Sequence, residues 1–253
     1  MAEGHAMARY VGHNDSIARR ASMTQFGRTG IMLDTINGSL DNLPSSITRR
    51  SGSVFYTGRS AFERPSPLYV LGLNPGGYPD LQCDETIAAD IAQFRSQPAN
   101  WSAYRDESWR GKAPGSHGMQ PRVLHMMRRL GLQPHEVPAS NVVFVRSATE
   151  AELNFEKAAL LKACWPVHEA VIDALQCRTV LCFGGTAGRW VRSILRANTP
   201  VGQLRETNAR GWLNEAHLNS EGLAVLTLTH PGRADWRNPD ADPFPLIENV
   251  LAR

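Results

Sequence analysis

Lysine is scarce in this chain of 253 residues, in which the 27 basic side chains include only Lys112, Lys157 and Lys162 as lysines. Nearly all of the positive charge is therefore arginine. Its planar guanidinium suits phosphates and stacked bases, although genome composition is the simpler explanation. The formal net charge is only +3. This excludes a protein that binds nucleic acid through a large overall excess of positive charge.

Long apolar segments, an export signal and repeats are also missing. No run of about 18 apolar residues occurs, so we expect no membrane-spanning helix. The first residues, MAEGHAMARYVGHND, lack the apolar core of a secretion signal, which favours the cytoplasm. With 42% hydrophobic residues the chain can bury a full core. We therefore expect a monomer with one domain and an appendage.

Cysteine is sparse and shows no paired spacing. The four cysteines are Cys83, Cys164, Cys177 and Cys182, and no two of them form a CxxC pair. This pattern is typical of buried free thiols rather than of a zinc site or a disulfide framework. We therefore expect neither a metal ion nor another cofactor.

The sequence does contain an alternation of strand-like apolar runs and helical segments. Four strands are expected, at Leu68–Leu73, Asn141–Val145, Thr179–Phe183 and Ala224–Thr229. Helices are expected at Glu85–Ser96, Gln120–Leu130, Phe155–Leu175, Thr186–Arg196 and Pro245–Leu251. The alternation predicts an α/β fold, a three-layer α-β-α sandwich around a central, mostly parallel four-stranded sheet.

Residues 1–50 lack this alternation and hold scattered arginines. Short helices are expected there at Asp15–Met23 and Ile31–Leu43. We assign residues 1–50 to an N-terminal arm or cap and residues 51–253 to the main domain.

The stretch Leu68–Tyr78, LYVLGLNPGGY, carries the strongest functional signal. Its apolar run predicts a buried strand that ends in Asn74-Pro75-Gly76-Gly77. Pro75 cannot donate to a strand ladder, and the glycines permit close approach of a ligand. Asn74 would then lie at the carboxyl end of a strand, where open α/β sheets bind ligands. An ordinary strand-to-loop turn is the alternative.

A second strand pattern, Ala224–Thr229, runs into the polar turn His230-Pro231-Gly232-Arg233. Two buried strands that end in Asn-Pro-Gly and His-Pro-Gly would aim an amide and an imidazole at one cleft. A lone histidine is more often a structural residue than a catalyst. The pair of motifs therefore carries more information than either motif alone.

The two motifs together resemble the uracil-DNA glycosylase superfamily. Gly72–Gly76 matches the GxNPG motif of the mismatch-specific and single-strand-selective branches, and His230–Gly232 matches the HPS motif or a close variant of it. Ala139–Arg146, ASNVVFVR, is similar to the superfamily's TNVV strand, and Val180–Gly188, VLCFGGTAG, to its third strand and the following helix. The four motifs occur in the superfamily's order over roughly residues 67–253.

The resemblance implies how the chain would break an N-glycosidic bond. Asn74 would orient the attacking water, and His230 would donate to O2 of the leaving base from a neighbouring strand. Asn141 would pair with a flipped uracil or, with its amide turned, a cytosine. The alternative for Asn141 is a strand-start residue that bonds its own loop.

Because an amide is a poor general base, a modest rate is expected unless a carboxylate assists Asn74. Candidates for that assistance are Asp80, Asp84 and Glu85. The alternative for these acids is a solvated loop and a helix N-cap.

The resemblance also implies how a flipped base would be held. Stacking on an aromatic ring is worth about 1–3 kcal/mol per base. Tyr78, Trp101, Tyr104 and Trp109 follow the first motif, and we name Tyr78 and Trp109 as candidates. Gly76 stands where the strictly uracil-selective branch carries a tyrosine that blocks substituents at C5. A glycine there implies a pocket open to C5-modified pyrimidines.

In the superfamily the loop after the histidine enters the minor groove and fills the gap left by the flipped nucleotide. Arg233 and Trp236 are the expected wedge residues. Arg233 ranks first because the single-strand-selective branch carries an arginine at that position. The alternative places Trp236 in the core and Arg233 on a phosphate.

The resemblance predicts a monofunctional DNA glycosylase that removes uracil or a C5-modified pyrimidine, in repair or in defence against modified phage DNA. Its partner would be duplex or single-stranded DNA. The iron–sulfur cluster of the thermostable branch is not expected, because Val145 stands at one cysteine position and only Cys164 matches. The alternative is a catalytically weak member of the same fold that binds nucleic acid without cleaving it.

Overall fold

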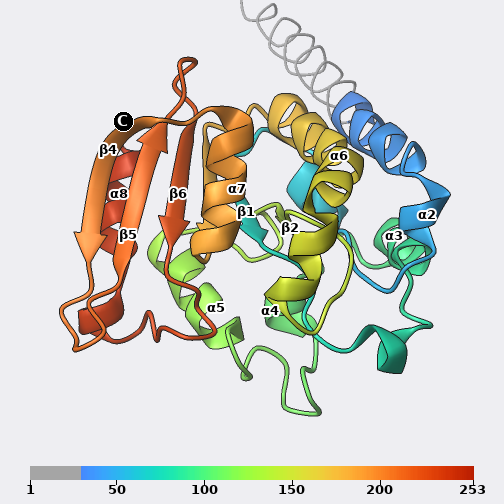
Figure 1. Cartoon of the computed structure of the whole chain (residues 1–253), viewed down its shortest axis with the longest axis horizontal. Coiled ribbons are helices and arrows are strands. Elements are labelled where there is room, and N and C mark those ends of the chain that lie inside the picture. Colours follow the sequence, from blue (N-terminus) through green and yellow to red (C-terminus); the bar gives the residue numbers. More distant parts are fainter. Residues whose placement is uncertain (1–29) are drawn as a thin grey trace, which may run out of the picture.

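The computed structural model describes residues 30–253, so the helix expected at Asp15–Met23 lies outside the described residues. Helices cover both faces of one sheet (Figure 1). The strands are β1 Leu68–Gly72, β2 Ala139–Asn141, β3 Thr179–Phe183, β4 Thr199–Arg205, β5 Leu213–Leu218 and β6 Ala224–Leu228. The predicted α/β class is confirmed, but the sheet has six strands rather than four.

A helix over residues 30–41 precedes the labelled helices of the domain. The α-helices are α2 Ser45–Thr48, α3 Ile87–Ser96, α4 Ala103–Asp106, α5 Gln120–Arg129, α6 Glu150–Ala174, α7 Gly185–Leu195 and α8 Phe244–Leu251. Short 3-10 helices are η1 Arg59–Phe62, η2 Pro79–Gln82 and η3 Pro239–Ala241.

The order of the strands is β2-β1-β3-β6-β5-β4. The first four strands run parallel to one another. β1, β3 and β6 match predicted strands, whereas β2 ends at Asn141, the residue at which the predicted strand Asn141–Val145 begins. β5 pairs antiparallel with β6, and β4 pairs antiparallel with β5. The two strands absent from the prediction therefore extend the parallel sheet at one edge, where α8 lies behind them (Figure 1).

Alternate residues of the central strands face different helical layers, as the period of two in a strand requires. On β1, Tyr69 and Leu71 belong to the core that includes side chains of α6 and α7. Leu68 and Val70 belong to the core that includes side chains of α5 and α8. Two apolar layers thus hold the sheet, and the carboxyl ends of its parallel strands remain at one edge.

The proposed boundary at residue 50 does not coincide with a change in packing. Ile36 and Leu40, from the helix over residues 30–41, are fully buried in the same core as Phe62 and Phe94. Residues 30–50 therefore contribute to the core of the domain that follows them.

The four cysteines differ in exposure. Cys164, Cys177 and Cys182 are buried free thiols, whereas Cys83 is exposed. Burial raises the pKa of the Cys164 thiol to about 11 and that of Cys177 to about 12. Thiolate chemistry at neutral pH is therefore suppressed at these two residues.

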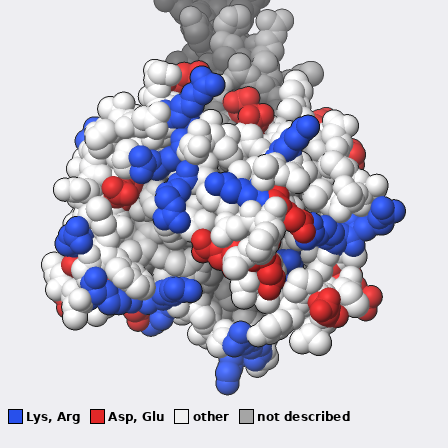
Figure 2. Space-filling model, viewed as in Figure 1, with Lys and Arg blue, Asp and Glu red and all other residues white. Residues whose placement is uncertain are grey.

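The visible surface mixes both signs of charge. Figure 2 shows arginine and lysine side chains spread over this face, with acidic side chains between them. Within residues 30–253, no helix is long and apolar enough to cross a bilayer.

Candidate functional site

The parallel strands deliver polar residues to one edge of the sheet. Asn141 ends β2, Asn74 follows β1, Gly184 follows β3 and His230 follows β6. The expectation that Asn74 and His230 end neighbouring strands is wrong, because β1 and β6 each pair with β3 and not with each other. Gly184 lies between them, and a Cβ at this glycine would come within 3.7 Å of the His230 side chain.

The turn after β6 fixes the tautomer of His230. The backbone N–H of Gly232 donates to Nδ1 of His230 at 2.9 Å. Nδ1 is therefore the acceptor, and the neutral ring carries its hydrogen on Nε2. A Cβ at Gly232 would lie 2.9 Å from Nδ1, so the glycine permits this close approach.

His230 stays neutral at lower pH than a free histidine. Burial lowers its pKa, and the positive charges of Arg233 and Arg122 lower it further. Arg122, from α5, also donates to the carbonyl of Pro231 and lies 3.5 Å from the Asp235 carboxylate. One arginine thus holds the histidine turn and disfavours the charged imidazolium.

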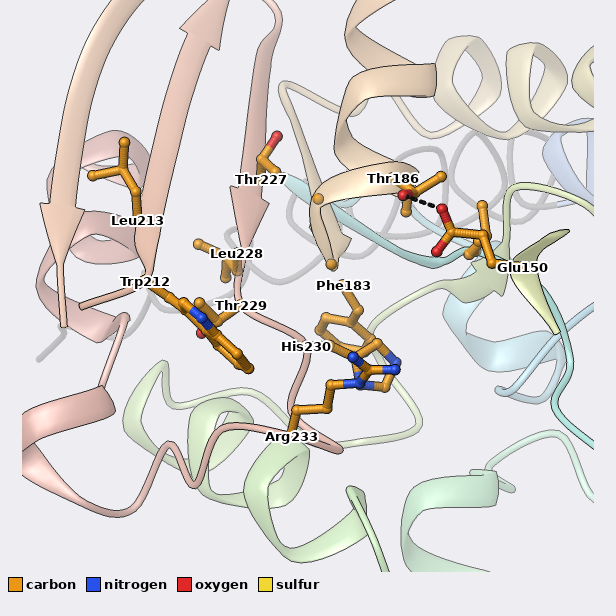
Figure 3. A pocket seen from close by; sticks show the side chains of 14 residues that line it. Glu150, Phe183, Thr186, Trp212, Leu213, Thr227, Leu228, Thr229, His230 and Arg233 are labelled. Atoms are coloured by element: carbon orange, nitrogen blue, oxygen red, sulfur yellow. Dashed lines mark hydrogen bonds between the residues drawn. The ribbon is translucent and has the colours of Figure 1, made fainter. Parts of the chain in front are cut away.

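His230 lines a cleft of about 420 Å³ (Figure 3). Leu73, which follows β1, and Trp212, which precedes β5, also line this cleft. Glu150, at the start of α6, accepts a hydrogen bond from Thr186 at 2.6 Å. Asn74, Asn141, Gly76, Tyr78 and Trp109 are not among the lining residues. The expectation that Asn74 and His230 face one cleft is therefore not met, because only the neighbouring Leu73 reaches the cleft from the end of β1.

Asn74 is held through its amide nitrogen. Nδ2 donates to the Ser147 hydroxyl at 3.1 Å and to the carbonyl of Pro75 at 2.8 Å. Ser147 in turn donates to the carbonyl of Thr149 at 2.8 Å. No described residue donates to the Asn74 amide oxygen, so that oxygen can accept from a water.

Asn141 is buried, with only 5% of its surface exposed. Its Nδ2 donates to the Tyr56 hydroxyl at 2.9 Å, and a Cβ at Gly72 would lie 2.1 Å from its Oδ1. The first glycine of the GxNPG motif thus makes room for the Asn141 amide. Asn141 therefore lies beside the end of β1, and its amide is hydrogen-bonded to the Tyr56 hydroxyl.

Aromatic rings continue outward from Tyr56. The Tyr56 and Tyr104 rings stack with centroids 5.9 Å apart, and Trp109 meets Tyr104 edge-on at 6.1 Å. Trp109 is therefore connected to Asn141 through two tyrosines. Tyr78 is 63% exposed and Trp101 is half-buried.

The loop that contains Gly76 is anchored by Arg146. This guanidinium donates to the Gly76 carbonyl, to the Ser51 hydroxyl at 3.0 Å and to the Glu85 carboxylate at 2.7 Å. Glu85 therefore has a structural partner, whereas Asp80 and Asp84 are exposed. The space beside Gly76 is open, since a Cβ there would meet no atom within 4 Å.

The two wedge candidates have different fates. Arg233 is exposed and lines the cleft. Trp236 is only 1% exposed and packs against Phe183 with ring centroids 5.5 Å apart. The expectation that Trp236 reaches DNA is wrong, because its ring completes the core on the α5 and α8 side of the sheet.

Sequence reasoning overlooked four residues that shape this region, which are Tyr56, Arg122, Arg146 and Trp212. Arg146 is the last residue of the TNVV-like segment, and that position was a usable signal. Tyr56 and Arg122 lie outside every motif, so only the fold reveals them. Trp212 belongs to the hairpin that the sequence pattern did not indicate.

No family model matches the chain, and no curated protein matches it.

Proposed function

We propose that this protein is a monofunctional DNA glycosylase that hydrolyses the N-glycosidic bond of uracil or a C5-modified pyrimidine in DNA. The observation that carries the proposal is the neutral His230, whose Nδ1 accepts from Gly232 while its Nε2–H is free for a ligand in the cleft. Cleavage builds negative charge on O2 of the departing base. A preorganised N–H donor in a partly buried site stabilises that charge.

Asn74 supports the hydrolytic half of the reaction. Its amide nitrogen is tied to Ser147 and Pro75, so its amide oxygen is oriented before a ligand arrives. An amide oxygen can accept from the attacking water but removes its proton poorly. The water would therefore attack a sugar that already carries much positive charge, and we expect a modest rate.

The space beside Gly76 supports acceptance of substituents at C5. A Cβ at this residue would meet no atom within 4 Å, so no side chain of the described residues fills that position. Asn141 is the candidate that would read the Watson–Crick edge of the base. To do so, its amide must exchange the Tyr56 hydroxyl for the base or bind with its Oδ1.

A catalytically weak nucleic-acid-binding protein is the alternative. The pairing of Glu85 with Arg146 favours it, because this carboxylate is engaged away from the water that Asn74 would hold. The two functions differ in one observable, which is release of a free base.

The test is a panel of oligonucleotides that contain uracil, thymine or 5-hydroxymethylcytosine, followed by alkali. Base-specific strand breaks are the expected result. Asn74→Ala and His230→Ala should each lower turnover by about 10²-fold with little change in the unfolding midpoint.

Matched controls are Asn249→Ala, on the exposed surface of α8, and His125→Ala, a histidine of α5 that does not line the cleft. Both controls should retain activity. Full activity in Asn74→Ala and His230→Ala together would refute the catalytic assignment, and tight binding without strand breaks would favour the alternative.

A further inference from the structure

The antiparallel hairpin β4–β5 brings an aromatic ring to the cleft. Trp212, one residue before β5, lines the same cleft as His230 and is 38% exposed. Figure 3 shows its indole reaching from the start of β5 toward the interior of the cleft, with His230 and Arg233 across from it.

Arg210 holds one side of the indole. Its guanidinium carbon lies 4.4 Å from the centre of the Trp212 ring. The same side chain donates to the Arg233 carbonyl at 2.6 Å and pairs with the Glu206 carboxylate at 3.1 Å. Arg210 thus connects the hairpin to the turn that carries His230.

The hairpin loop has a buried anchor. Glu206 is only 6% exposed, and its Oε2 also accepts from the Asn208 amide at 2.9 Å. The backbone N–H of Glu206 donates to the Trp212 carbonyl at 2.9 Å. Burying a carboxylate is unfavourable unless it keeps charged or hydrogen-bonding partners. Glu206 therefore favours the arrangement in which Arg210 stays paired with it, and its backbone bond to Trp212 holds that residue beside them.

We propose that Trp212 is a stacking platform for an unpaired nucleobase that flanks the excised one, a role that rests on the proposed glycosylase function. An indole presents a flat, polarisable face that stacks on any base, and a guanidinium on the other side strengthens the contact. Arg233 supplies positive charge beside this face for the connecting phosphate.

A base inside a duplex is covered on both faces by its neighbours. Only an unstacked base is free to lie on Trp212, so the platform favours single-stranded or locally opened DNA. The ligand chemistry is therefore a nucleobase adjacent to the target nucleotide, on a strand with no partner.

The experiment is a double-mutant cycle on single-stranded oligonucleotides that contain one uracil. The probes carry an abasic tetrahydrofuran residue at each flanking position in turn, and binding is measured by fluorescence anisotropy. For the native protein, loss of one particular flanking base should weaken binding by about 10-fold. Trp212→Ala should weaken binding of the intact strand by a similar factor and then be indifferent to loss of that base.

Trp212→Phe keeps a flat ring and should retain most of the affinity. Phe155→Ala is the matched control, because it removes an exposed ring of α6 that does not line the cleft. Thermal unfolding of each variant identifies any loss of fold. The proposal is overturned if Trp212→Ala and loss of the flanking base weaken binding independently, so that their two fold-changes multiply when they are combined. It is also overturned if a folded Trp212→Ala protein binds the intact strand with unchanged affinity.

Base release is measured separately with the native protein. If no base is released but Trp212 and one flanking base are coupled in binding, the glycosylase function fails and the stacking platform stands. If bases are released without that coupling, the platform fails and the glycosylase function stands.

Discussion

The Asn141 amide fills the space that a side chain at Gly72 would need. The Asn141 amide oxygen lies 2.1 Å from the position that a Cβ of Gly72 would take. Because β1 and β2 are in register at this pair, neither residue can move without disturbing the strand ladder. Glycine is therefore needed at position 72 because the Asn141 amide takes the place of a side chain there. The first glycine of the GxNPG motif thus reflects a contact between β1 and β2.

Gly72→Ala should displace the Asn141 amide. Overpacking of a filled interior costs about 1–3 kcal/mol, so we expect a loss of that size in the free energy of unfolding. Combination with Asn141→Ala should recover at least about 1 kcal/mol of the sum of the two single losses, because the space is then vacant. Urea denaturation measures all three variants.

Gly38→Ala is the control, since a Cβ at this helical glycine meets no atom within 4 Å. It should be neutral or slightly stabilising. Additive losses for the Gly72 and Asn141 variants would contradict the shared-space account.

In the proposed function, Gly76 would set the width of the base pocket. Gly76→Tyr should abolish release of C5-substituted bases and spare uracil, because the new ring would fill the open space beside the loop. Gly76→Ala adds a single methyl group and should keep both activities. The measurement is base release from matched uracil and 5-substituted oligonucleotides. If the native protein releases uracil but rejects every C5-substituted base, the open-pocket account is wrong.

At the scale of elements, the turn after β6 is the segment that meets a DNA backbone in the proposed function. Arg122 and Arg210 both donate to its carbonyls, at Pro231 and Arg233. The Arg233 side chain itself is exposed and has no ion-pair partner among the described residues. A rigid turn thus presents one free guanidinium.

Arg233→Ala should reduce excision from duplex DNA about 10-fold more than excision from single strands. Only a duplex must be opened, at a cost of a few kcal/mol that a wedge offsets. Because Arg233 also lowers the pKa of His230, both proteins are assayed at pH 8, where the imidazole is neutral in each.

Arg237→Ala, which removes another exposed arginine of this segment, is the control and should affect both substrates equally. An equal loss on both substrates for Arg233→Ala would leave it only a general attraction to phosphate.

The sequence predicted those strands that are buried on both faces. β1, β3 and β6 are continuous apolar runs, and their predicted bounds agree with the structure to within one residue. β2 ends at Asn141, where the prediction began, although Val142 and Val143 still donate to the β1 chain. β4 and β5 were overlooked because β4 is largely exposed and contains Pro200 and Gly202. A local sequence pattern does not reveal strands, such as β4 and β5, that form mainly because they pair with a neighbouring strand.

Candidate residues at strand ends could be predicted for the same reason. Parallel strands share one edge, so Asn74, Asn141 and His230 had to lie along it. The order along that edge depends on crossovers, and the sequence does not encode it locally. Tyr56 and Arg146 act through long-range contacts with Asn141 and Glu85. Such contacts leave no local pattern.

At the scale of the whole molecule, a half-buried carboxylate, Asp90, and a fully buried imidazole, His168, have opposite effects on stability in acid. Asp90 accepts from the Val54 N–H at 2.7 Å, and burial raises its pKa from 3.8 to about 6. His168 bonds the Tyr69 hydroxyl at 2.8 Å, and burial lowers its pKa from 6.5 to about 4. Asp90 binds its proton more tightly in the folded than in the unfolded protein, so its contribution to the free energy of unfolding falls as pH rises from 4 to 6. Folded His168 resists protonation, so its term rises with pH over the same range.

Each of these terms amounts to about 3 kcal/mol, so they largely cancel in the native protein. Asp90→Asn keeps an acceptor for Val54 and removes the falling term. Relative to the native protein, this variant should gain about 3 kcal/mol between pH 4 and pH 7, measured by urea denaturation. A difference between the two proteins that does not change with pH would contradict the assignment.

Cys83 makes this protein easy to observe in solution. It is the one exposed thiol among four, and it directly follows η2 in the loop that Arg146 anchors beside Gly76. A maleimide fluorophore would therefore attach at a single position without any prior substitution. The dye would stand on the segment that follows the Asn-Pro-Gly motif, and its emission would report movement of that segment while the candidate residues Asn74 and His230 keep their native identity.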